Sequence, residues 1–457
     1  MIISYIFLFS LALIGLFFYH RRSTFFQLVP LSLMLGAIFL ITGTQSQAVG
    51  EFASNWKIIP GLLINVVFAT LFFGKKIMGF KKIWKFAGPQ IAFGQTLAWG
   101  QYVVGIALTA LVLVPLFSIS PLTGALIEIS FEGGHGTVAG LKTLFNELNF
   151  AEGYDLALGL ATIGILVGIA SGLFMTAIYR SRSGSGKKPI KKNSKKRPLY
   201  SMFGEYIVDT HNSYFAHHKI PRTLLQIALV GLAILIGAGI KWILSQIESF
   251  MQLFVNIPDI IQFMPLFPLA MIGGIAIQLI LQKIGYEKII HGKTMVFIGA
   301  LALEIVIITA IATMSLSAIS ENLIPFILIA LAGTLWNISA FLLFAPSIIK
   351  KNWFERGIGD YGQSMGMTAT GLLLMRSADP ANKSQALERF GYKQLLFEPV
   401  VGGGLFTAMS MILIAKYEQL PIFILTFIFL CFWLIVAKKA LLQNKKHLFE
   451  VVFLCFF

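Results

Sequence analysis

Residues 130–140, SFEGGHGTVAG, place four glycines and a histidine between two strongly apolar stretches of the chain. Glu132 lies inside this segment and Glu128 lies just before it. In a bilayer, an unpartnered peptide group that faces lipid costs several kcal/mol, so non-helical backbone must be buried in protein or line water. The segment is therefore a candidate for a re-entrant loop, and the rest of the sequence decides whether its surroundings fit.

The composition is that of a polytopic membrane protein. The 457 residues are 57% hydrophobic and only 12% charged, with a mean hydropathy of +0.81, which leaves little surface for water. A helix needs about 18 to 20 apolar residues to cross the hydrocarbon layer. Segments near this length predict eleven crossings, with bounds near 2–19, 24–43, 56–73, 88–116, 154–179, 222–245, 265–282, 294–317, 323–349, 394–415 and 421–437.

The net charge of +16 indicates membrane topology rather than nucleic-acid binding, because Lys and Arg accumulate in cytoplasmic loops. With the N-terminus outside and the C-terminus in the cytoplasm, most of the 36 Lys and Arg residues fall on the cytoplasmic side. The four exceptions are Lys57, Lys142, Lys241 and Lys416. This assignment holds only if two glycine-rich segments, near 121–140 and 359–378, enter the membrane and return. We therefore predict two re-entrant loops.

A basic stretch divides the chain into two halves. The sequence RSRSGSGKKPIKKNSKKR, which begins at Arg180, has the composition of a solvated linker. It predicts a cytoplasmic linker at 181–221 between a first half, 1–180, and a second half, 222–416. An extra transmembrane helix and a cytoplasmic tail follow at 417–457.

The two halves resemble each other at one constant offset. A shift of 238 residues aligns VPLSLMLGAI, from Val29, with FPLAMIGGIA, from Phe267. The same shift aligns GYDLALGLATIG, from Gly153, with GYKQLLFEPVVG, from Gly391. Each half has five predicted spans, so the second copy enters the membrane from the opposite side. We predict an all-α fold of two inverted-topology five-helix repeats, an architecture typical of secondary transporters, whose sites form near the midplane between the repeats.

The sequence lacks the residues of disulfide frameworks, cysteine metal sites and common enzyme motifs. Its two cysteines, Cys431 and Cys455, provide neither a disulfide framework nor a cysteine metal site. The sequence has no HExxH, no GxSxG and no nucleotide-binding loop. We therefore expect no enzyme, no cofactor and no metal beyond a transported ion.

The first glycine-rich segment has the residue types of an anion site. Its glycines allow the chain to reverse and bring bare amides close to a ligand, and a short helix that starts near Thr137 would direct its positive end at a carboxylate. A small acidic substrate is the ligand that such a site would hold. A tight extramembrane turn with a capping threonine is the alternative.

The second glycine-rich segment, GDYGQSMGMTATGLLLMRSADP, begins at Gly359 and occupies the corresponding place of the second half. Two such loops that enter from opposite faces would meet near the centre of the bilayer. The carbonyl and hydroxyl oxygens of Gln363, Ser364 and Thr368 suit Na⁺, because hard cations prefer oxygen ligands.

Ionisable side chains inside a membrane are functional candidates by default. Three carboxylates are candidates for coupling an ion or a proton: Glu132, Asp360 and Glu398. Asp360 has an alternative interpretation as a solvated residue at the cytoplasmic mouth of the second loop.

Four stretches carry a family resemblance: PLTGALIEISFEGGHGT, ATIGILVGIASG, ERFGY and EPVVGG. With them, most of the chain resembles the glutamate:sodium symporter (ESS) family of bacterial secondary transporters. The resemblance implies inverted repeats, homodimers in the inner membrane and Na⁺-driven uptake of glutamate. It implies site roles for Gly133, Gly134, His135, Gly136, Thr137, Gly362, Gly366 and Thr368. Glu132 departs from the family pattern, which has a small residue there, and it would repel an anionic substrate unless protonated or paired with a cation.

The predicted function is Na⁺-coupled symport of L-glutamate, or of a similar small anionic amino acid, by alternating access through the lipid bilayer. The alternative is a cation- or proton-coupled carrier or exporter of a different small substrate, which Glu132, Asp360 and Glu398 favour. A non-transporting membrane scaffold is a second alternative, but it would leave the two paired loops unexplained.

Overall fold

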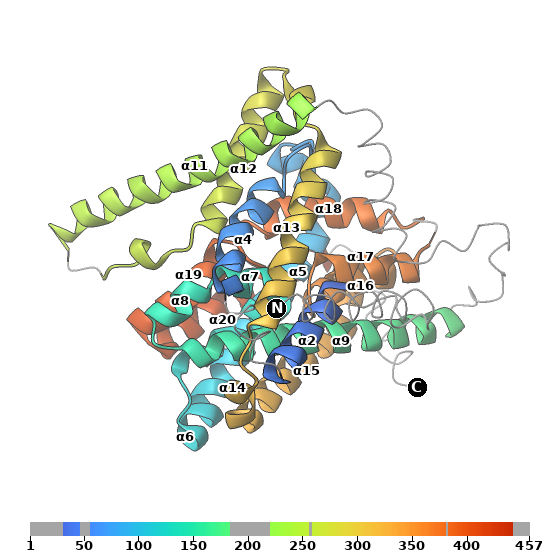
Figure 1. Cartoon of the computed structure of the whole chain (residues 1–457). Helices are drawn as coiled ribbons and strands as arrows, with labels where there is room; N and C mark the ends of the chain where they lie inside the picture. The colour runs from blue at the N-terminus through green and yellow to red at the C-terminus, as the bar shows by residue number, and fades with distance from the viewer. Residues whose placement is uncertain (1–30, 46–54, 183–219, 256–257, 381–382, 442–457) are drawn as a thin grey trace. The chain divides into compact units, whose positions relative to one another are not determined.

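The computed structural model describes residues 31–45, 55–182, 220–255, 258–380 and 383–441 (Figure 1). In these ranges the regular elements are helices, and no strand occurs. The predicted all-α fold class is thus confirmed. The predicted first span, 2–19, lies outside the described residues, as do most of the linker and the end of the tail.

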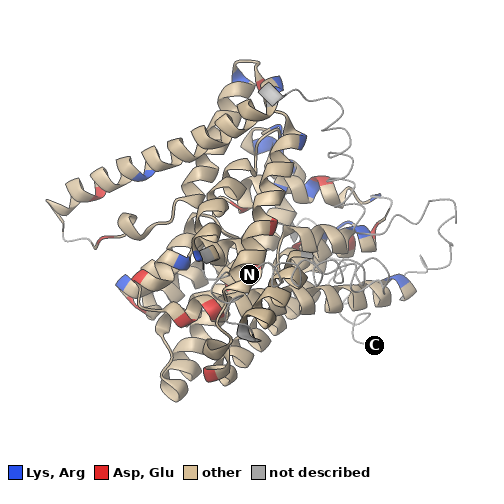
Figure 2. Ribbon diagram, in the orientation of Figure 1, with Lys and Arg blue, Asp and Glu red and all other residues tan. Residues whose placement is uncertain are grey.

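Ten apolar helices overlap predicted spans, so the chain is an integral membrane protein. Six are long and apolar enough to cross a membrane: Phe80–Phe117, Ala151–Ser181, Thr223–Gln252, Gly292–Ala312, Leu323–Ile348 and Gln419–Ala437. Four are shorter: Ser32–Gly43, Trp56–Thr70, Phe267–Lys283 and Leu405–Tyr417. Figure 2 shows long runs of helix with neither basic nor acidic residues, as a hydrocarbon environment requires.

The chain folds into two compact units, each of which draws on both halves of the sequence. Unit 1 comprises residues 1–77, 139–147 and 190–316. Its helices include α2 (Leu31–Gln45), η1 (Asn55–Ile58), α4 (Ile59–Thr70), α8 (Lys142–Glu147), α11 (Ile220–Gln252), α12 (Phe267–Lys283) and α13 (Gly292–Ala312).

Unit 2 comprises residues 78–138, 148–189 and 317–457. Its long helices are α5 (Phe80–Leu108), α9 (Ala151–Arg182), α15 (Leu323–Ile348) and α20 (Gln419–Leu441). Its shorter elements include η2 (Thr109–Leu113), α6 (Val114–Phe117), η3 (Pro121–Ala125), η4 (Glu128–Glu132), α16 (Trp353–Gln363), α17 (Thr368–Ala378), α18 (Ala386–Phe397) and α19 (Leu405–Tyr417). The first five residues of α7 (Gly134–Gly140) also belong to unit 2.

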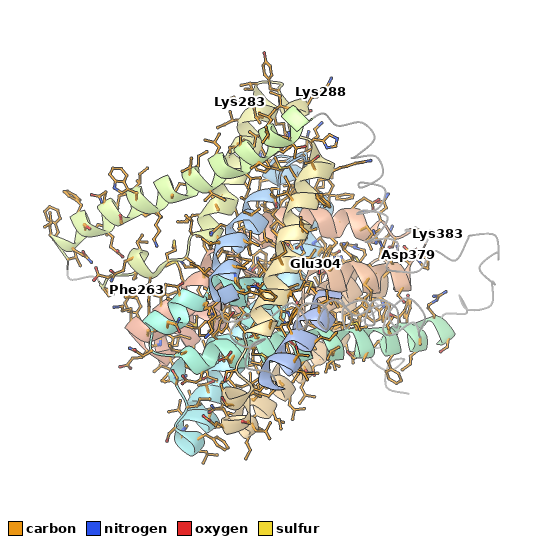
Figure 3. The ribbon with its side chains drawn as sticks, viewed as in Figure 1. Phe263, Lys283, Lys288, Glu304, Asp379 and Lys383 are labelled. Carbon is orange, nitrogen blue, oxygen red and sulfur yellow. The ribbon has the colours of Figure 1, made fainter. Side chains whose placement is uncertain are left out.

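Small residues bring the helices of unit 1 into close contact. A Cβ atom on Gly274 of α12 would lie 2.4 Å from the carbonyl oxygen of Ala69 in α4. A Cβ atom on Gly36 of α2 would lie 2.8 Å from Cβ of Ile311 in α13. Such contacts let backbones approach where no hydrophobic driving force acts between helices in lipid. Glu304 lies midway along α13 (Figure 3), within unit 1.

Helix α5 is the centre of unit 2, where it packs against α15, α18 and α20. The indole Nε1 of Trp336 on α15 donates to the carbonyl oxygen of Leu97 at 2.9 Å. The indole fits here because residue 100 is glycine: a Cβ atom on it would lie 1.7 Å from the Trp336 ring. The extra C-terminal helix packs on the same α5, where Phe429 stacks on Trp99 with ring centroids 4.5 Å apart.

The two glycine-rich segments differ from the expected irregular backbone. Each is a helix, a short break and a second helix. In the first, η4 ends at Glu132 and α7 begins at Gly134, whose φ is +69°. In the second, α16 ends at Gln363 and α17 begins at Thr368, and the two pack on each other. The helix expected to start near Thr137 begins three residues earlier, at Gly134. The non-helical chain of this segment is therefore shorter than predicted, because helices on both sides satisfy most backbone groups internally.

The predicted helix at 394–415 is also two helices, α18 and α19, separated by residues 398–404. Pro399 has no N–H to donate, and Gly402 and Gly403 have φ of +73° and +97°. These φ values lie in the left-handed region, which glycine adopts without strain. The sequence EPVVGGG therefore breaks an otherwise apolar helix.

Candidate functional site

The two glycine-rich segments of unit 2 meet at their breaks. A Cβ atom on Gly134 would lie 2.5 Å from the carbonyl oxygen of Gly366, so the two backbones are in direct contact. The hydroxyl of Ser364 donates a hydrogen bond to Oε2 of Glu132. Both side chains are buried. The structure thus joins one predicted coupling carboxylate to one predicted Na⁺ ligand, across the 232 residues that separate them in sequence.

Among the buried polar atoms of the first segment that have no hydrogen-bond partner in the described residues, three belong to Glu132 or to residues after it. They are Oε1 of Glu132, Nδ1 of His135 and Oγ1 of Thr137, and each residue is at most 3% exposed. The other ring nitrogen of His135 lies 2.9 Å from Oγ1 of Thr162 on α9. Because nearly all buried polar atoms in proteins are paired, these three are the atoms of this segment best placed to bind an ion or a polar substrate.

Two buried amide side chains hold the break in the second segment. Nε2 of Gln101 on α5 donates to the Ser364 carbonyl oxygen at 2.7 Å, and Nδ2 of Asn337 on α15 donates to the same oxygen at 2.8 Å. The two amides also bond each other at 3.1 Å. Both are fully buried. The position of Ser364 beside Glu132 is therefore set by helices on either side.

Asp360 forms a fully buried ion pair with Lys393 of α18, in which Nζ lies 3.0 Å from Oδ1. Gln90 of α5 donates to Oδ2 of Asp360 at 2.7 Å. Lys393 also donates to Oε1 of Gln363 at 2.9 Å. Buried charges are stable only when they are paired and hydrogen-bonded, and both ions here meet that condition. The interpretation of Asp360 as a solvated residue at a loop mouth is wrong, because its side chain is 0% exposed.

A hydrogen-bonded chain connects the remaining predicted polar residues. Nε2 of Gln394 donates to Oε1 of Gln363 at 3.0 Å and to Oγ1 of Thr368 at 3.2 Å. Thr368 in turn donates to Oε1 of Glu398 at 3.1 Å. Glu398, at the break after α18, is thereby linked to the start of α17.

Glu128 is as deeply buried as Glu132 but is well supplied with donors. It accepts hydrogen bonds from the hydroxyl of Tyr102 at 2.5 Å, the N–H of Gly402 at 2.9 Å and the hydroxyl of Thr407 at 2.8 Å. Both of its oxygens have partners. This carboxylate ties η4 to α5 and to the break before α19.

The predicted site glycines have different surroundings. Gly134 and Gly366 form the contact between the segments. Gly362 packs α16 against α17, because a Cβ atom on it would lie 2.9 Å from Cα of Gly371. Gly133 is similarly confined by its own segment, where a Cβ atom would lie 2.5 Å from the Ile129 carbonyl oxygen. Gly136 is buried within α7.

Sequence reasoning missed Lys393, the most unusual residue of the cluster. The charge count assigned it to the cytoplasmic side, whereas the structure buries it completely. Its position in GYKQLLFEP, at the start of an apolar segment, was the available signal, since an ionisable residue in such a segment is a functional candidate. Gln90 and Asn337 were missed because single amides within apolar helices have no distinguishing pattern.

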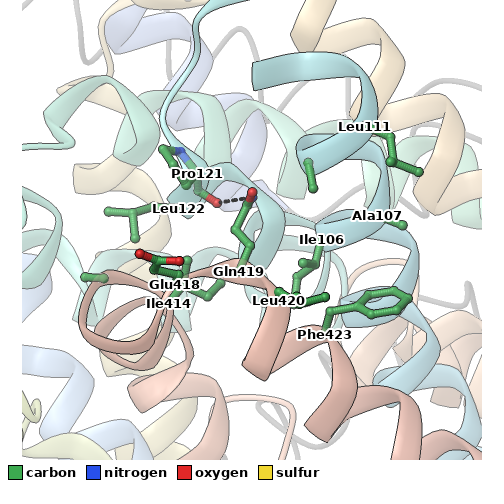
Figure 4. Close-up of a pocket in the computed structure, with 12 residues that line it drawn as sticks. Ile106, Ala107, Leu111, Pro121, Leu122, Ile414, Glu418, Gln419, Leu420 and Phe423 are labelled. Carbon is green, nitrogen blue, oxygen red and sulfur yellow. Dashed lines mark hydrogen bonds between the residues drawn. The ribbon is translucent and has the colours of Figure 1, made fainter. Parts of the chain in front are cut away.

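A separate groove of about 730 Å³ lies between the end of α5 and the start of α20 (Figure 4). Its lining is mostly apolar and includes Leu111 and Phe423, with Glu418 at one side. Gln419 closes part of it by donating to the Pro121 carbonyl oxygen at 3.0 Å. The groove shares no lining residue with the polar cluster. Among the described residues, no three His, Cys, Asp or Glu side chains gather to hold a metal ion.

Comparison with known proteins gives one match. A sequence model of the family described as sodium/glutamate symporter matches residues 4–377. The match includes the first segment and nearly all of the second, and it ends before Lys393 and Glu398. No match to the chain is found among curated proteins or among solved structures.

Proposed function

Because the chain belongs to the sodium/glutamate symporter family, we propose that it couples Na⁺ entry to the uptake of L-glutamate or of a similar small anionic amino acid. The observation that carries the proposal is the hydrogen bond between Glu132 and Ser364. It joins two glycine-rich breaks that both lie inside a buried polar cluster. Broken helices of this kind provide backbone and side-chain oxygens for cations at membrane depth.

The cation site that we propose centres on Glu132. One of its carboxylate oxygens bonds Ser364, and the other has no partner among the described residues. Oxygen ligands with a negative charge suit Na⁺. A cation there would also remove the repulsion between this carboxylate and an anionic substrate, so bound Na⁺ would favour substrate binding. His135, Thr137 and the first turn of α17 are the nearby groups that we assign to the substrate.

We also propose that the fold is an inverted repeat. An offset of 238 residues carries α2 onto α12, α4 onto α13, α5 onto α15 and α9 onto α18 and α19. The contacts agree, since Gly36 of α2 packs on α13 and its counterpart Gly274 of α12 packs on α4. Repeats of this kind support alternating access, in which one part of the protein moves against another around the site.

The test is uptake of radiolabelled L-glutamate into proteoliposomes, with and without an inward Na⁺ gradient. Accumulation that depends on the gradient is expected, and it should disappear when a Na⁺ ionophore collapses the gradient. Other small acids and amino acids, tested as competitors, define the substrate. If no anionic amino acid accumulates in response to Na⁺, the proposal is wrong.

A second candidate is proton coupling, which the buried Glu132 carboxylate favours because the same group can carry a proton instead of Na⁺. In this case a pH gradient without Na⁺ would drive uptake in the same vesicles. Such a result would keep the site and change the coupling ion.

The family also leads us to propose a homodimer in the inner membrane. Native mass spectrometry of the purified protein should then detect about twice the 50.4 kDa mass of the chain. A monomer that transports would contradict this part of the proposal.

A further inference from the structure

The Lys393 ammonium occupies a site with the features of a monovalent-cation site. Its ligands are two side-chain oxygens, Oδ1 of Asp360 at 3.0 Å and Oε1 of Gln363 at 2.9 Å. Both oxygens come from the last turn of α16, where the negative end of the helix dipole stabilises a cation. Oxygen ligands and a negative helix end are also what Na⁺ prefers.

The surrounding residues are shaped around this ammonium. On α5, Gly94 leaves the necessary space, because a Cβ atom there would lie 2.8 Å from Nζ and 2.6 Å from Cε of Lys393. On another side, Nζ lies 3.7 Å from the ring centroid of Phe397. An aromatic face attracts a cation through its quadrupole. The site is thus enclosed by oxygens, a missing side chain and an aromatic ring.

The same site is connected to the cation site proposed at Glu132. Gln363, a ligand of the ammonium, directly precedes Ser364, which donates to Glu132. Lys393 and Glu132 are therefore connected through the adjacent residues Gln363 and Ser364.

We propose that Lys393 is a tethered cation that occupies a monovalent-cation site formed by Asp360 and Gln363. A free Na⁺ therefore does not enter this site. The transporter then binds one Na⁺ fewer per substrate than it would if Asp360 had no lysine partner. The part concerning transport rests on the proposed function, whereas the occupation of the site by Lys393 does not.

The first experiment measures ion binding without transport. Wild type, Lys393→Gln and the double variant Asp360→Asn/Lys393→Gln are purified, and their unfolding temperatures are recorded over a range of NaCl, with choline chloride as the control salt. Lys393→Gln removes the ion-pair partner of the buried Asp360 and vacates the position of the ammonium, so Na⁺ should stabilise this variant more than wild type. In the double variant the carboxylate is absent as well, and the additional Na⁺ effect should disappear.

The second experiment measures coupling in proteoliposomes. In Lys393→Gln the Hill coefficient for Na⁺ should rise by about one relative to wild type, as expected when one more site must fill. If wild type shows no Na⁺-dependent uptake, the proposed function fails, but the ion-binding experiment still tests the site.

Three results would overturn the inference. The first is an unfolding temperature of Lys393→Gln with the same Na⁺ dependence as that of wild type. The second is a higher KM for substrate with unchanged Na⁺ dependence, which would make Lys393 a substrate ligand. The third is a single variant that no Na⁺ concentration allows to fold, beside a double variant that folds, which would make the ion pair purely structural.

Discussion

At the scale of single residues, Glu128 and Glu132 are both buried but differ in the number of hydrogen-bond donors around them. Glu128 and Glu132 stand at the two ends of one π-helical turn and are 0% and 3% exposed. Glu128 accepts from three donors, whereas only one oxygen of Glu132 is bonded. A buried carboxylate with a full set of hydrogen bonds is a structural element. One with an unpartnered oxygen remains able to bind an ion.

Glu132→Gln should weaken the Na⁺ dependence of uptake. The amide oxygen can still accept from Ser364, but the charge that attracts Na⁺ is removed. We expect the Na⁺ concentration for half-maximal uptake to rise by about tenfold or more, which corresponds to about 1.4 kcal/mol or more of lost ion binding. Uptake measured over a range of Na⁺ concentrations checks this.

The matched control for this prediction is Glu128→Gln, which removes the same charge four residues away. Its oxygen can still accept from Gly402 and Thr407. We expect lower thermal stability with an unchanged Na⁺ requirement. Equal shifts in the two variants would show that Glu132 has no specific role.

Gly134→Ala should disrupt the contact between the two segments. Its φ of +69° costs a residue with a Cβ about 1 to 2 kcal/mol, and the added atom would lie 2.5 Å from the Gly366 carbonyl oxygen. We expect a lower unfolding temperature and loss of uptake. The control is Gly231→Ala on α11, where a Cβ atom has nothing within 4 Å, and its unfolding temperature should not fall. If Gly134→Ala resembles this control, the proposed contact is not required.

At the scale of elements, the candidate site is formed by three broken helices in unit 2. The breaks at residues 133, 364–367 and 398–404 place polar groups together because each break interrupts the internal hydrogen bonds of a helix. The uninterrupted helices α5 and α15 supply the amides that hold one of these breaks in place. Helices α5 and α15 therefore help to position the candidate site.

The C-terminal helix α20 also has a structural task, since it covers α5 directly behind the site. Phe429→Ala removes the ring that stacks on the buried Trp99 at 4.5 Å. An aromatic pair contributes about 1 kcal/mol beyond its buried area, so a lower unfolding temperature is expected. The neighbouring Ile428, which is 57% exposed, gives the control Ile428→Ala with little change. The same decrease in both variants would indicate a general loss of apolar surface.

At the scale of the whole molecule, the charge distribution predicts orientation. The basic linker at 181–221 and the C-terminal tail are expected in the cytoplasm, because Lys and Arg are retained on that side. The connection after α11 is then expected outside.

Reporter fusions test this orientation. Fluorescent protein fused after residue 457 or within the linker should fluoresce, and alkaline phosphatase inserted after residue 255 should be active. If the segment near 121–140 crossed the membrane completely, the linker and the connection after α11 would exchange sides. Inactive phosphatase after residue 255 would therefore contradict the re-entrant assignment.

The sequence alone determined the class of protein, the positions of nine described apolar helices and part of a tenth, and the two segments that meet in the candidate site. These properties are local, because the transfer of a helix into lipid depends on the apolar residues of that helix. Where the local signal was polar, as at residues 133–140, it indicated an interruption but not its short length.

Only the tertiary structure decided which polar residue bonds which. Gln90 and Asp360 are 270 residues apart in sequence. The sequence predicted a cytoplasmic Lys393, whereas in the structure α18 places it in the buried polar cluster. The same is true of Glu128 and Glu132, whose difference depends on donors from distant helices. A hydrogen bond depends on the distance between two particular atoms, and helix packing sets that distance.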